Sequence, residues 1–389
     1  AMAAAAIASA GMAWGQEASI EERLAALEGA SSAYVDNSYL FLISGLVVMF
    51  MAAGFCMLEA GLVRSKNAAM QSTKNIALFS VAGLMFYLIG YQILYPSSWI
   101  VENVIGMPAV WAPGELGTSD GDYASSSDWY FQMVFVATAA SIVSGTVAER
   151  VRIWPFLIFT AFLTGVIYPI QCSWQWGEGW LYQMGFSDFA GSTLVHSVGG
   201  WAALVGAIVI GPRAGKYFGK SVNPMPGSNI PLAALGTFIL WFGWFGFNGG
   251  SQLAAGGIED INSVAKIFVN TNMAAVGGVL AAMILTASLY KGKIDATMVF
   301  NGAIGGLVSI TAEPLTPAVW QAVLIGGVGG VLVVLTVPLL DRFKIDDVVG
   351  AIPAHLVCGI WGTLAVPITN GGTSFVTQLI GVVAIGAFV

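Results

Sequence analysis

Long apolar stretches separated by short polar segments dominate the pattern of this chain. A helix needs about 20 apolar residues to cross the hydrocarbon core of a bilayer. Stretches near that length run over residues 39–63, 76–95, 129–148, 153–170, 190–210, 230–248, 267–290, 296–310, 319–340 and 348–366, and a last one starts at residue 375. We therefore predict an all-α membrane protein with eleven transmembrane helices in one domain, residues 39–389.

The two ends of the chain depart from this pattern. Residues 1–16 resemble the apolar core and cleavage region of a signal peptide, and we interpret them as its remnant. Residues 17–38 contain a short amphipathic helix over residues 20–28, which we expect on the extracytoplasmic side. The stretch from Phe375 stops at Val389, short of a full span, so we expect the eleventh helix to be incomplete.

The composition also favours a bilayer. Hydrophobic residues make up 57% of the chain and charged residues 9%, whereas a soluble domain carries about 25% charged residues. Nothing in this composition indicates an enzyme or a nucleic-acid partner. Cys56, Cys172 and Cys358 each lie in an apolar run and are too few for a disulfide framework or a zinc cluster. We expect no cofactor and no metal.

The basic residues predict the orientation, because loops rich in Lys and Arg stay cytoplasmic. All but Arg23 and Lys266 follow an odd-numbered helix: Arg64, Lys66, Lys74, Arg150, Arg152, Arg213, Lys216, Lys220, Lys291, Lys293, Arg342 and Lys344. The alternate loops carry acids such as Glu102, Glu115 and Glu259. We therefore place the amino terminus outside and the carboxyl terminus inside the inner (plasma) membrane.

The only two histidines lie at corresponding places in the two halves. His196 in the fifth apolar stretch and His355 in the tenth each begin a His-x-Val-x-Gly pattern. An odd number of helices and this match indicate an inverted repeat of five helices each, with one helix left over. A pseudo-two-fold axis in the membrane plane would bring the two histidines together at mid-depth.

A histidine inside a spanning helix has three interpretations. It faces a partner or a cavity and is functional, it is a buried neutral imidazole bonded to a backbone carbonyl, or it binds a metal. A zinc site needs three or four protein ligands, and the sequence supplies no others here. Two histidines at matched positions favour a functional pair that forms a polar thread through a dry pore.

Two sequence runs carry a resemblance to a known family. Residues 188–196 (DFAGSTLVH) and residues 244–251 (WFGFNGGS) resemble the signatures of the Amt/Mep/Rh ammonium transporters, and Trp176 and Ser251 favour the Amt branch. The resemblance implies transport of ammonium, captured outside and passed on as ammonia and a proton. It also implies a homotrimer, and it allows a GlnK-type regulatory protein at the cytoplasmic face.

The resemblance assigns five residues to an outer ammonium recruitment site: Phe131, Phe135, Trp176, Asp188 and Ser251. Aromatic faces attract a cation by about 0.5–2 kcal/mol each, and a hydroxyl can accept a hydrogen bond from ammonium. The aromatic residues could instead belong to an interfacial belt. Asp188 could act only as a helix cap, or could both cap the helix and tune the electrostatic field at the cation.

The same resemblance assigns the pore. Phe135 and Phe247 match a stacked phenyl gate, and His196, His355 and Trp244 match the pore beneath it. The phenyl and indole rings would otherwise be interpreted as core residues. One departure concerns the run before His355, where residues 350–354 replace an aspartate and a Phe-Gly-Val sequence; Pro353 is expected to kink that helix.

Two other functions stay open at this point. An ammonium sensor would use the same membrane domain and report occupancy to a cytoplasmic signalling module. A passive gas channel of the Rh type is disfavoured by Trp176 and Ser251.

Overall fold

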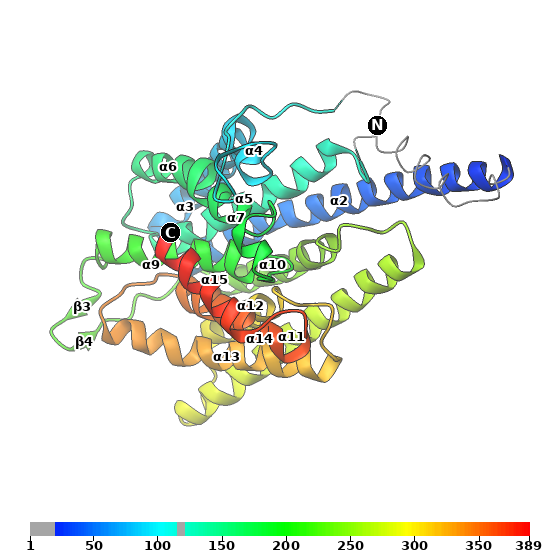
Figure 1. The fold of residues 1–389 in the computed structure, drawn as a ribbon. Coiled ribbons are helices and arrows are strands. Elements are labelled where there is room, and N and C mark those ends of the chain that lie inside the picture. The colour runs from blue at the N-terminus through cyan, green and yellow to red at the C-terminus, as the bar shows by residue number, and fades with distance from the viewer. Residues whose placement is uncertain (1–19, 115–120) are drawn as a thin grey trace.

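The computed structural model describes residues 20–114 and 121–389, so the signal-peptide interpretation of residues 1–16 lies outside the described residues. The chain is a bundle of helices (Figure 1). The long helices are α2 (Ile20–Leu62), α3 (Ser65–Met85), α5 (Ser125–Thr146), α6 (Ile153–Phe162), α9 (Val198–Ile210), α10 (Ile230–Gly250), α11 (Ile258–Leu289), α12 (Ala296–Ile310), α13 (Val319–Arg342), α14 (Cys358–Thr369) and α15 (Phe375–Phe388).

Short elements extend or connect these helices. Four π-helical segments occur within the longer helical spans, η2 (Phe86–Gly90), η3 (Leu163–Ile167), η4 (Ser192–Ser197) and η5 (Ile352–Val357). Three helices have six residues or fewer, α4 (Tyr91–Leu94), α7 (Tyr168–Ser173) and α8 (Trp180–Gln183). Two antiparallel hairpins consist of β1 (Trp99–Val101) with β2 (Ile105–Gly106) and β3 (Tyr217–Phe218) with β4 (Ser221–Val222).

Each of the eleven predicted stretches is helical in the described part of the chain. Eight helices there are long and apolar enough to cross a membrane, and α12 and α15 are shorter apolar helices. Several predicted boundaries are wrong. The helix expected at residues 20–28 is not separate, because α2 continues from Ile20 to Leu62. Lys74, expected in a loop, lies inside α3 and is buried.

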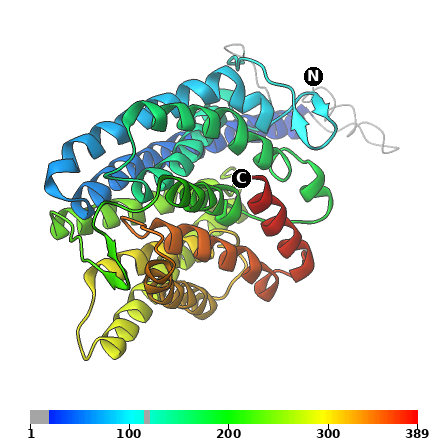
Figure 2. The same ribbon diagram turned by 90° about the vertical axis from the view of Figure 1, so that its left-hand side faces the viewer.

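The two halves of the chain occupy opposite sides of the bundle. Seen from the left-hand end of Figure 1, α2 to α7 form one side, and α11 to α14 form the other (Figure 2). Helices α2 and α10 pack along each other more extensively than any other pair. A Cβ on Gly236 would lie 2.2 Å from the backbone nitrogen of Leu58. Glycine therefore permits the close backbone approach that stabilises helix pairs in membranes.

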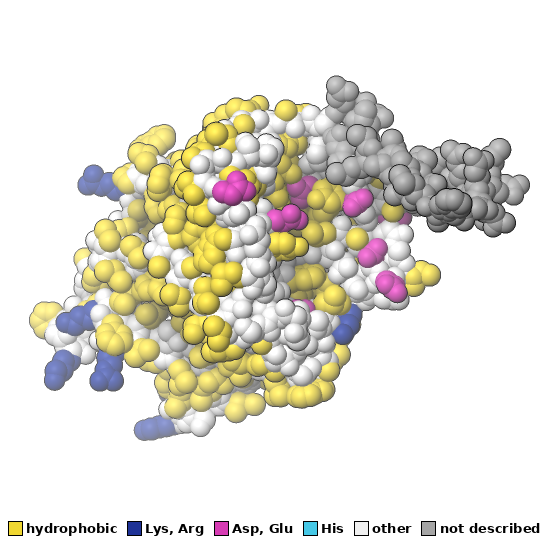
Figure 3. Space-filling model, viewed as in Figure 1, with side chains coloured by type: hydrophobic (Ala, Val, Ile, Leu, Met, Phe, Trp, Pro, Cys, Tyr) yellow, Lys and Arg dark blue, Asp and Glu magenta, His cyan; other side chains and the backbone are white. Residues whose placement is uncertain are grey.

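The surface separates charge from apolar side chains. Most Lys and Arg side chains in view gather at the left-hand end of the molecule, near β3 and β4, and Asp and Glu lie toward the opposite side (Figure 3). The flank between them is mainly apolar, and the described part of the chain exposes many large apolar side chains, such as Ile158, Val209 and Phe238. An apolar flank of this extent suits contact with lipid rather than water.

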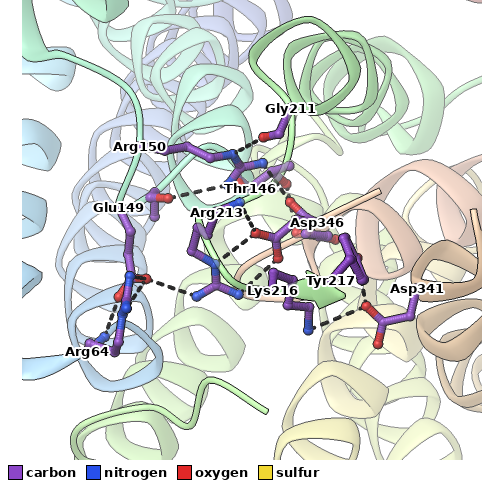
Figure 4. A network of polar contacts seen from close by, with 12 residues as sticks. Arg64, Thr146, Glu149, Arg150, Gly211, Arg213, Lys216, Tyr217, Asp341 and Asp346 are labelled. Carbon is purple, nitrogen blue, oxygen red and sulfur yellow. Dashed lines mark hydrogen bonds and ion pairs between the residues drawn. The ribbon is translucent and has the colours of Figure 1, made fainter. Parts of the chain in front are cut away.

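A network of ion pairs joins the loops at the basic end (Figure 4). Glu149 lies 2.8 Å from Arg64 and 3.0 Å from Arg213, and Arg213 also pairs with Asp346 at 2.8 Å. Burial raises the pKa of Glu149, but hydrogen bonds from Arg64 and Arg213 outweigh it and lower the pKa to about 2. The carboxylate stays charged at physiological pH, in keeping with a structural role for Glu149.

Candidate pore and ion-binding site

Each histidine follows a carboxylate that caps its helical segment. Asp188 is buried, and its two oxygens accept four backbone N–H bonds, at 2.8–3.0 Å, from the turn that begins η4. Asp347 plays the same part for η5, accepting from the backbone of Gly350 at 3.2 Å and Ile352 at 2.7 Å. These bonds satisfy amides that the first helical turn leaves free, and so fix where each π-helical segment begins.

The cap reveals a longer internal repeat than the sequence pattern first suggested. Both halves read Asp-x2-Gly-x4-His-x-Val-x-Gly, over residues 188–200 and 347–359. The glycine after each aspartate has positive φ, 102° at Gly191 and 80° at Gly350, where a side chain would be strained. Asp347, eight positions before its histidine just as Asp188 is, was the signal missed in the sequence.

The departure before His355 has a different outcome from the one expected. Pro353 stands in the first turn of η5, where a missing amide breaks no helical hydrogen bond. This position removes the reason for expecting a kink just ahead of His355. Gly350 begins the run in which an aspartate was expected. Asp347, three residues earlier, supplies the cap instead.

The two histidines meet in the interior. The Nδ1 atoms of His196 and His355 lie 3.2 Å apart, and their rings are inclined by 24°. Both side chains are buried, with 0% and 2% exposure. One Nδ1 carries the proton and the other accepts it, so the pair shares one hydrogen bond as neutral imidazoles do. Trp244 stacks on His196 at 4.9 Å and donates its indole N–H to Thr311 at 2.8 Å.

Two phenyl rings cover the histidines on one side. Phe135 and Phe247 are stacked, with centroids 3.8 Å apart and an interplanar angle of 16°. Phe247 also lies 5.3 Å from the ring of His196. Phe131 packs behind Phe135 at 4.7 Å and is buried. It contributes no surface to the cavity described next, so its assignment to direct cation contact has no geometric support.

A cavity of about 540 Å3 opens above the phenyl rings, at the end of the bundle opposite β3 and β4. Phe135, Trp176 and Ser251 all line it. The Ser251 hydroxyl donates to the carbonyl of Phe247 at 2.8 Å, which leaves its oxygen lone pairs free to accept a hydrogen bond. Trp176 donates its indole N–H to the carbonyl of Asp188 at 3.1 Å, but the Asp188 side chain does not line the cavity.

Two polar residues of this cavity, Asp128 and Gln132, were missed in the sequence. Asp128 lines it and accepts a hydrogen bond of 2.5 Å from the hydroxyl of Tyr91. Gln132 lines it too and donates to the hydroxyl of Tyr95 at 2.7 Å. Asp128 lies one helical turn before Phe131, just ahead of the predicted span at residues 129–148, and was not singled out in the sequence. It adds a carboxylate to the wall of the cavity.

A second, much smaller cavity lies beyond His355. Its volume is about 10 Å3, and Phe55, Glu59, Ser141 and Gly145 are among its lining residues with His355 itself. The Phe55 ring lies 6.0 Å from that of His355. The order along the axis is thus large cavity, phenyl pair, histidine pair and small cavity. Among the residues that the structure describes, no three His, Cys, Asp or Glu side chains gather as metal ligands.

Comparison with known proteins identifies the fold. The model of the Ammonium Transporter Family matches residues 39–387. This chain belongs to the ammonium transporter family. The resemblance predicted from residues 188–196 and 244–251 is thereby confirmed, and so is the prediction of a multi-pass, all-helical membrane protein. The family is one of transporters, not of enzymes.

Individual relatives share most of the chain. It is 42% identical over 344 residues to ammonium transporter Amt2 of Archaeoglobus fulgidus, covering 85% of this chain and 71% of that protein. It is 39% identical over 369 residues to ammonium transporter Amt2 of Haloferax mediterranei, covering 88% and 79%. The relatives' names describe those proteins, and the family membership rests on the match along the chain.

Solved structures agree with the fold. A structure titled Sensor Amt Protein superposes with a TM-score of 0.86 and 36% identity, covering 92% of this chain and 90% of that one. The crystal structure of Candida albicans Mep2 gives a TM-score of 0.82 with 25% identity, covering 92% and 83%.

Proposed function

We propose that this chain transports ammonium across the membrane, taking it from the large cavity and passing it through the histidine pair. The observation that carries the proposal is the buried contact of 3.2 Å between His196 and His355. This polar thread lies beneath stacked phenyl rings and between two cavities of very different size. The names of the relatives in the family support the choice of substrate.

Capture takes place in the large cavity. Trp176 and Phe135 present aromatic rings to a cation, and Ser251 offers lone pairs to one ammonium N–H. Asp128 adds a negative charge that attracts any small cation from outside. Asp188 contributes through the backbone that it fixes and not through contact, since its oxygens are occupied by four amides.

Passage requires the ion to lose a proton at the phenyl pair. Ammonia is neutral and can cross the apolar segment, while the proton moves along the imidazoles of His196 and His355. The two recombine on the inner side, so one net charge enters for each ammonium. The membrane potential then drives uptake by about 2.3 kcal/mol per 100 mV.

Currents from proteoliposomes on a solid-supported membrane test this function. An ammonium concentration jump is expected to produce a current that saturates with concentration. The observation that favours a second function, sensing, is the 36% identity to the structure titled Sensor Amt Protein. Ammonium that raises the melting temperature of the chain but produces no current would favour sensing over transport.

The outer site is expected to control affinity rather than maximal flux. Replacing Trp176 by Leu and Ser251 by Ala removes an aromatic face and a lone-pair acceptor from the large cavity. We expect the ammonium concentration at half-maximal current to rise at least about 5-fold, since the two contacts together contribute on the order of 1 kcal/mol or more. Currents measured over an ammonium titration give this value.

Matched controls come from the lipid-facing surface. Trp154 is an exposed tryptophan, and Ser80 donates to a carbonyl four residues earlier just as Ser251 does. The Trp154→Leu and Ser80→Ala variants are expected to keep the parent affinity. An unchanged half-maximal concentration in the Trp176→Leu, Ser251→Ala variant would count against the site.

The proposed orientation has a separate test. Glu115 lies outside the described residues, so single cysteines are placed at the exposed positions Glu102 and Lys220, in a background lacking the three native cysteines. An impermeant maleimide added outside intact cells is expected to label position 102 only, and position 220 only after permeabilisation. The reverse pattern would invert the topology. The homotrimer and a GlnK-type partner at the basic end remain proposals, supported by the family.

A further inference from the structure

Glu59 is a buried carboxylate near the inner end of the pore. It lies in α2, three residues before the helix ends, and is 1% exposed. Its Oε2 atom accepts hydrogen bonds from Gln71, from Asn75 at 2.7 Å and from Ser144 at 2.8 Å. Its Oε1 atom is buried and has no partner among the described residues. A buried carboxylate oxygen without a partner is costly and calls for an explanation.

The free oxygen belongs to the wall of the small cavity. Glu59 and Gly145 both line that cavity, and a Cβ on Gly145 would lie 3.4 Å from Oε1. His355 lines the same cavity. Because its Nδ1 faces His196, His355 has Nε2 as its remaining ring nitrogen. The volume of about 10 Å3 is close to what one water molecule requires.

A buried lysine balances the charge of Glu59. Lys74 is 3% exposed, its Nζ donates to the carbonyl of Ser144 at 2.8 Å and it lies 5.0 Å from the ring of Phe156. The hydroxyl of Ser144 donates in turn to Glu59. This arrangement compensates a carboxylate charge in the interior. The hydrogen bond from Ser144 reaches only Oε2, so the charge balance does not explain why Oε1 lacks a partner beside the small cavity.

Asp188 shows what a purely structural carboxylate looks like in the same molecule. Each of its oxygens accepts two backbone N–H bonds, and neither faces a cavity. Glu59 instead keeps one whole oxygen unused beside the cavity of His355. The difference points to chemistry at Glu59 and not to packing alone.

We propose that Glu59 accepts the proton that leaves the histidine pair on the inner side. A single water in the small cavity links Nε2 of His355 to Oε1. The N–H of His355 gives its proton to that water, and the water gives one of its own protons to Oε1. The neutral carboxyl then returns the proton to ammonia or to water on the cytoplasmic side. The inference rests on the proposed function, in which the proton and ammonia travel separately.

Three variants separate this role from that of a counter-ion to Lys74. Glu59→Gln keeps a carbonyl oxygen for the donors Gln71, Asn75 and Ser144, and places an amide toward the cavity. The double variant Glu59→Gln, Lys74→Met removes both charges, so the charge balance is kept. Lys74→Met alone removes the cation and leaves the proposed acceptor.

Maximal ammonium current in proteoliposomes is the readout. We expect a loss of at least ten-fold in Glu59→Gln and an equal loss in the double variant, with the half-maximal ammonium concentration within two-fold of the parent. Lys74→Met is expected to retain at least a third of the current. Full current in Glu59→Gln, or recovery of the current in the double variant, would overturn the proposal and leave Glu59 a counter-ion only.

Folding and function are controlled separately. Melting temperatures in detergent, with and without ammonium, show whether each variant is folded and still binds at the outer site. If Glu59→Gln does not fold, Glu59→Asp keeps the charge but withdraws the carboxylate by one methylene, and its current should fall at least three-fold; parent-level current in that variant would count against the relay. A parent chain without current rejects transport and the relay together, whereas a conducting parent with a conducting Glu59→Gln rejects the relay alone.

Discussion

Replacing both His196 and His355 by carboxylates is expected to let potassium through. Potassium resembles ammonium in size and charge, so aromatic rings and the Asp128 carboxylate attract both, and capture alone cannot select. In the proposed mechanism, discrimination occurs on entry into the dry segment, where ammonium can shed a proton but potassium loses several kcal/mol of hydration. Fixed negative charge and water between the cavities remove that barrier.

The measurement is growth of a strain deficient in potassium uptake, with currents from purified protein alongside. The parent is expected to fail to rescue growth, and the double carboxylate variant to rescue it with a potassium current at least ten-fold above the parent's. A variant with Asn at both positions adds polarity without charge and serves as control. If the parent conducts potassium as well as the variant does, or the variant stays ammonium-specific at full current, the histidines are not the filter.

Removing the cap at Asp188 is expected to destabilise the protein strongly. In Asp188→Ala, four buried amides lose their acceptors, and each unsatisfied buried group costs about 1–3 kcal/mol. Asp188→Asn keeps one oxygen but turns an amide donor toward two of the N–H groups. We expect a loss of at least about 4 kcal/mol for Ala, seen as a lower melting temperature in detergent or as failure to accumulate in the membrane.

Asp295 is the matched control for Asp188. It caps α12 by accepting from Thr297 and Met298, but it is only partly buried. Because water can replace a partly exposed cap, Asp295→Ala should cost only about 1 kcal/mol. Equal losses at the two positions would contradict a special role for the buried cap and would leave Asp188 an ordinary helix cap.

Much of the fold could be read from apolar length, because a bilayer requires long apolar helices. The boundaries of the helices could not be read from apolar length. Lys74 lies just before an apolar stretch in the sequence, but its charge is compensated inside α3 by Glu59 and Ser144, a contact that joins residues far apart in the chain. The break before Ser65 and the unbroken α2 likewise depend on packing rather than on local hydrophobicity.

Residues of the site could be predicted where a rare residue type marks them in the sequence. Two histidines in matching patterns predict their meeting, since an inverted repeat brings corresponding residues to one axis. Asp128 and Glu59 are ordinary acids in the sequence, and only the cavities show that they face the two ends of the pore. Phe131 illustrates the converse, since a residue at a matched position can lie behind Phe135, away from the wall of the large cavity.

The twin caps at Asp188 and Asp347 give the pore nearly the same construction when it is viewed from either side of the membrane. Such a conduit has no built-in direction, and microscopic reversibility forbids the unequal cavities from creating one. If one charge enters with each ammonium, as proposed above, 100 mV supports an accumulation of about 50-fold. When the external ammonium concentration falls below about one fiftieth of the internal concentration, the same route carries ammonium out of the cell. Under this proposal, a cell that contains the protein must either consume ammonium as quickly as it arrives or close the pore from the cytoplasmic side.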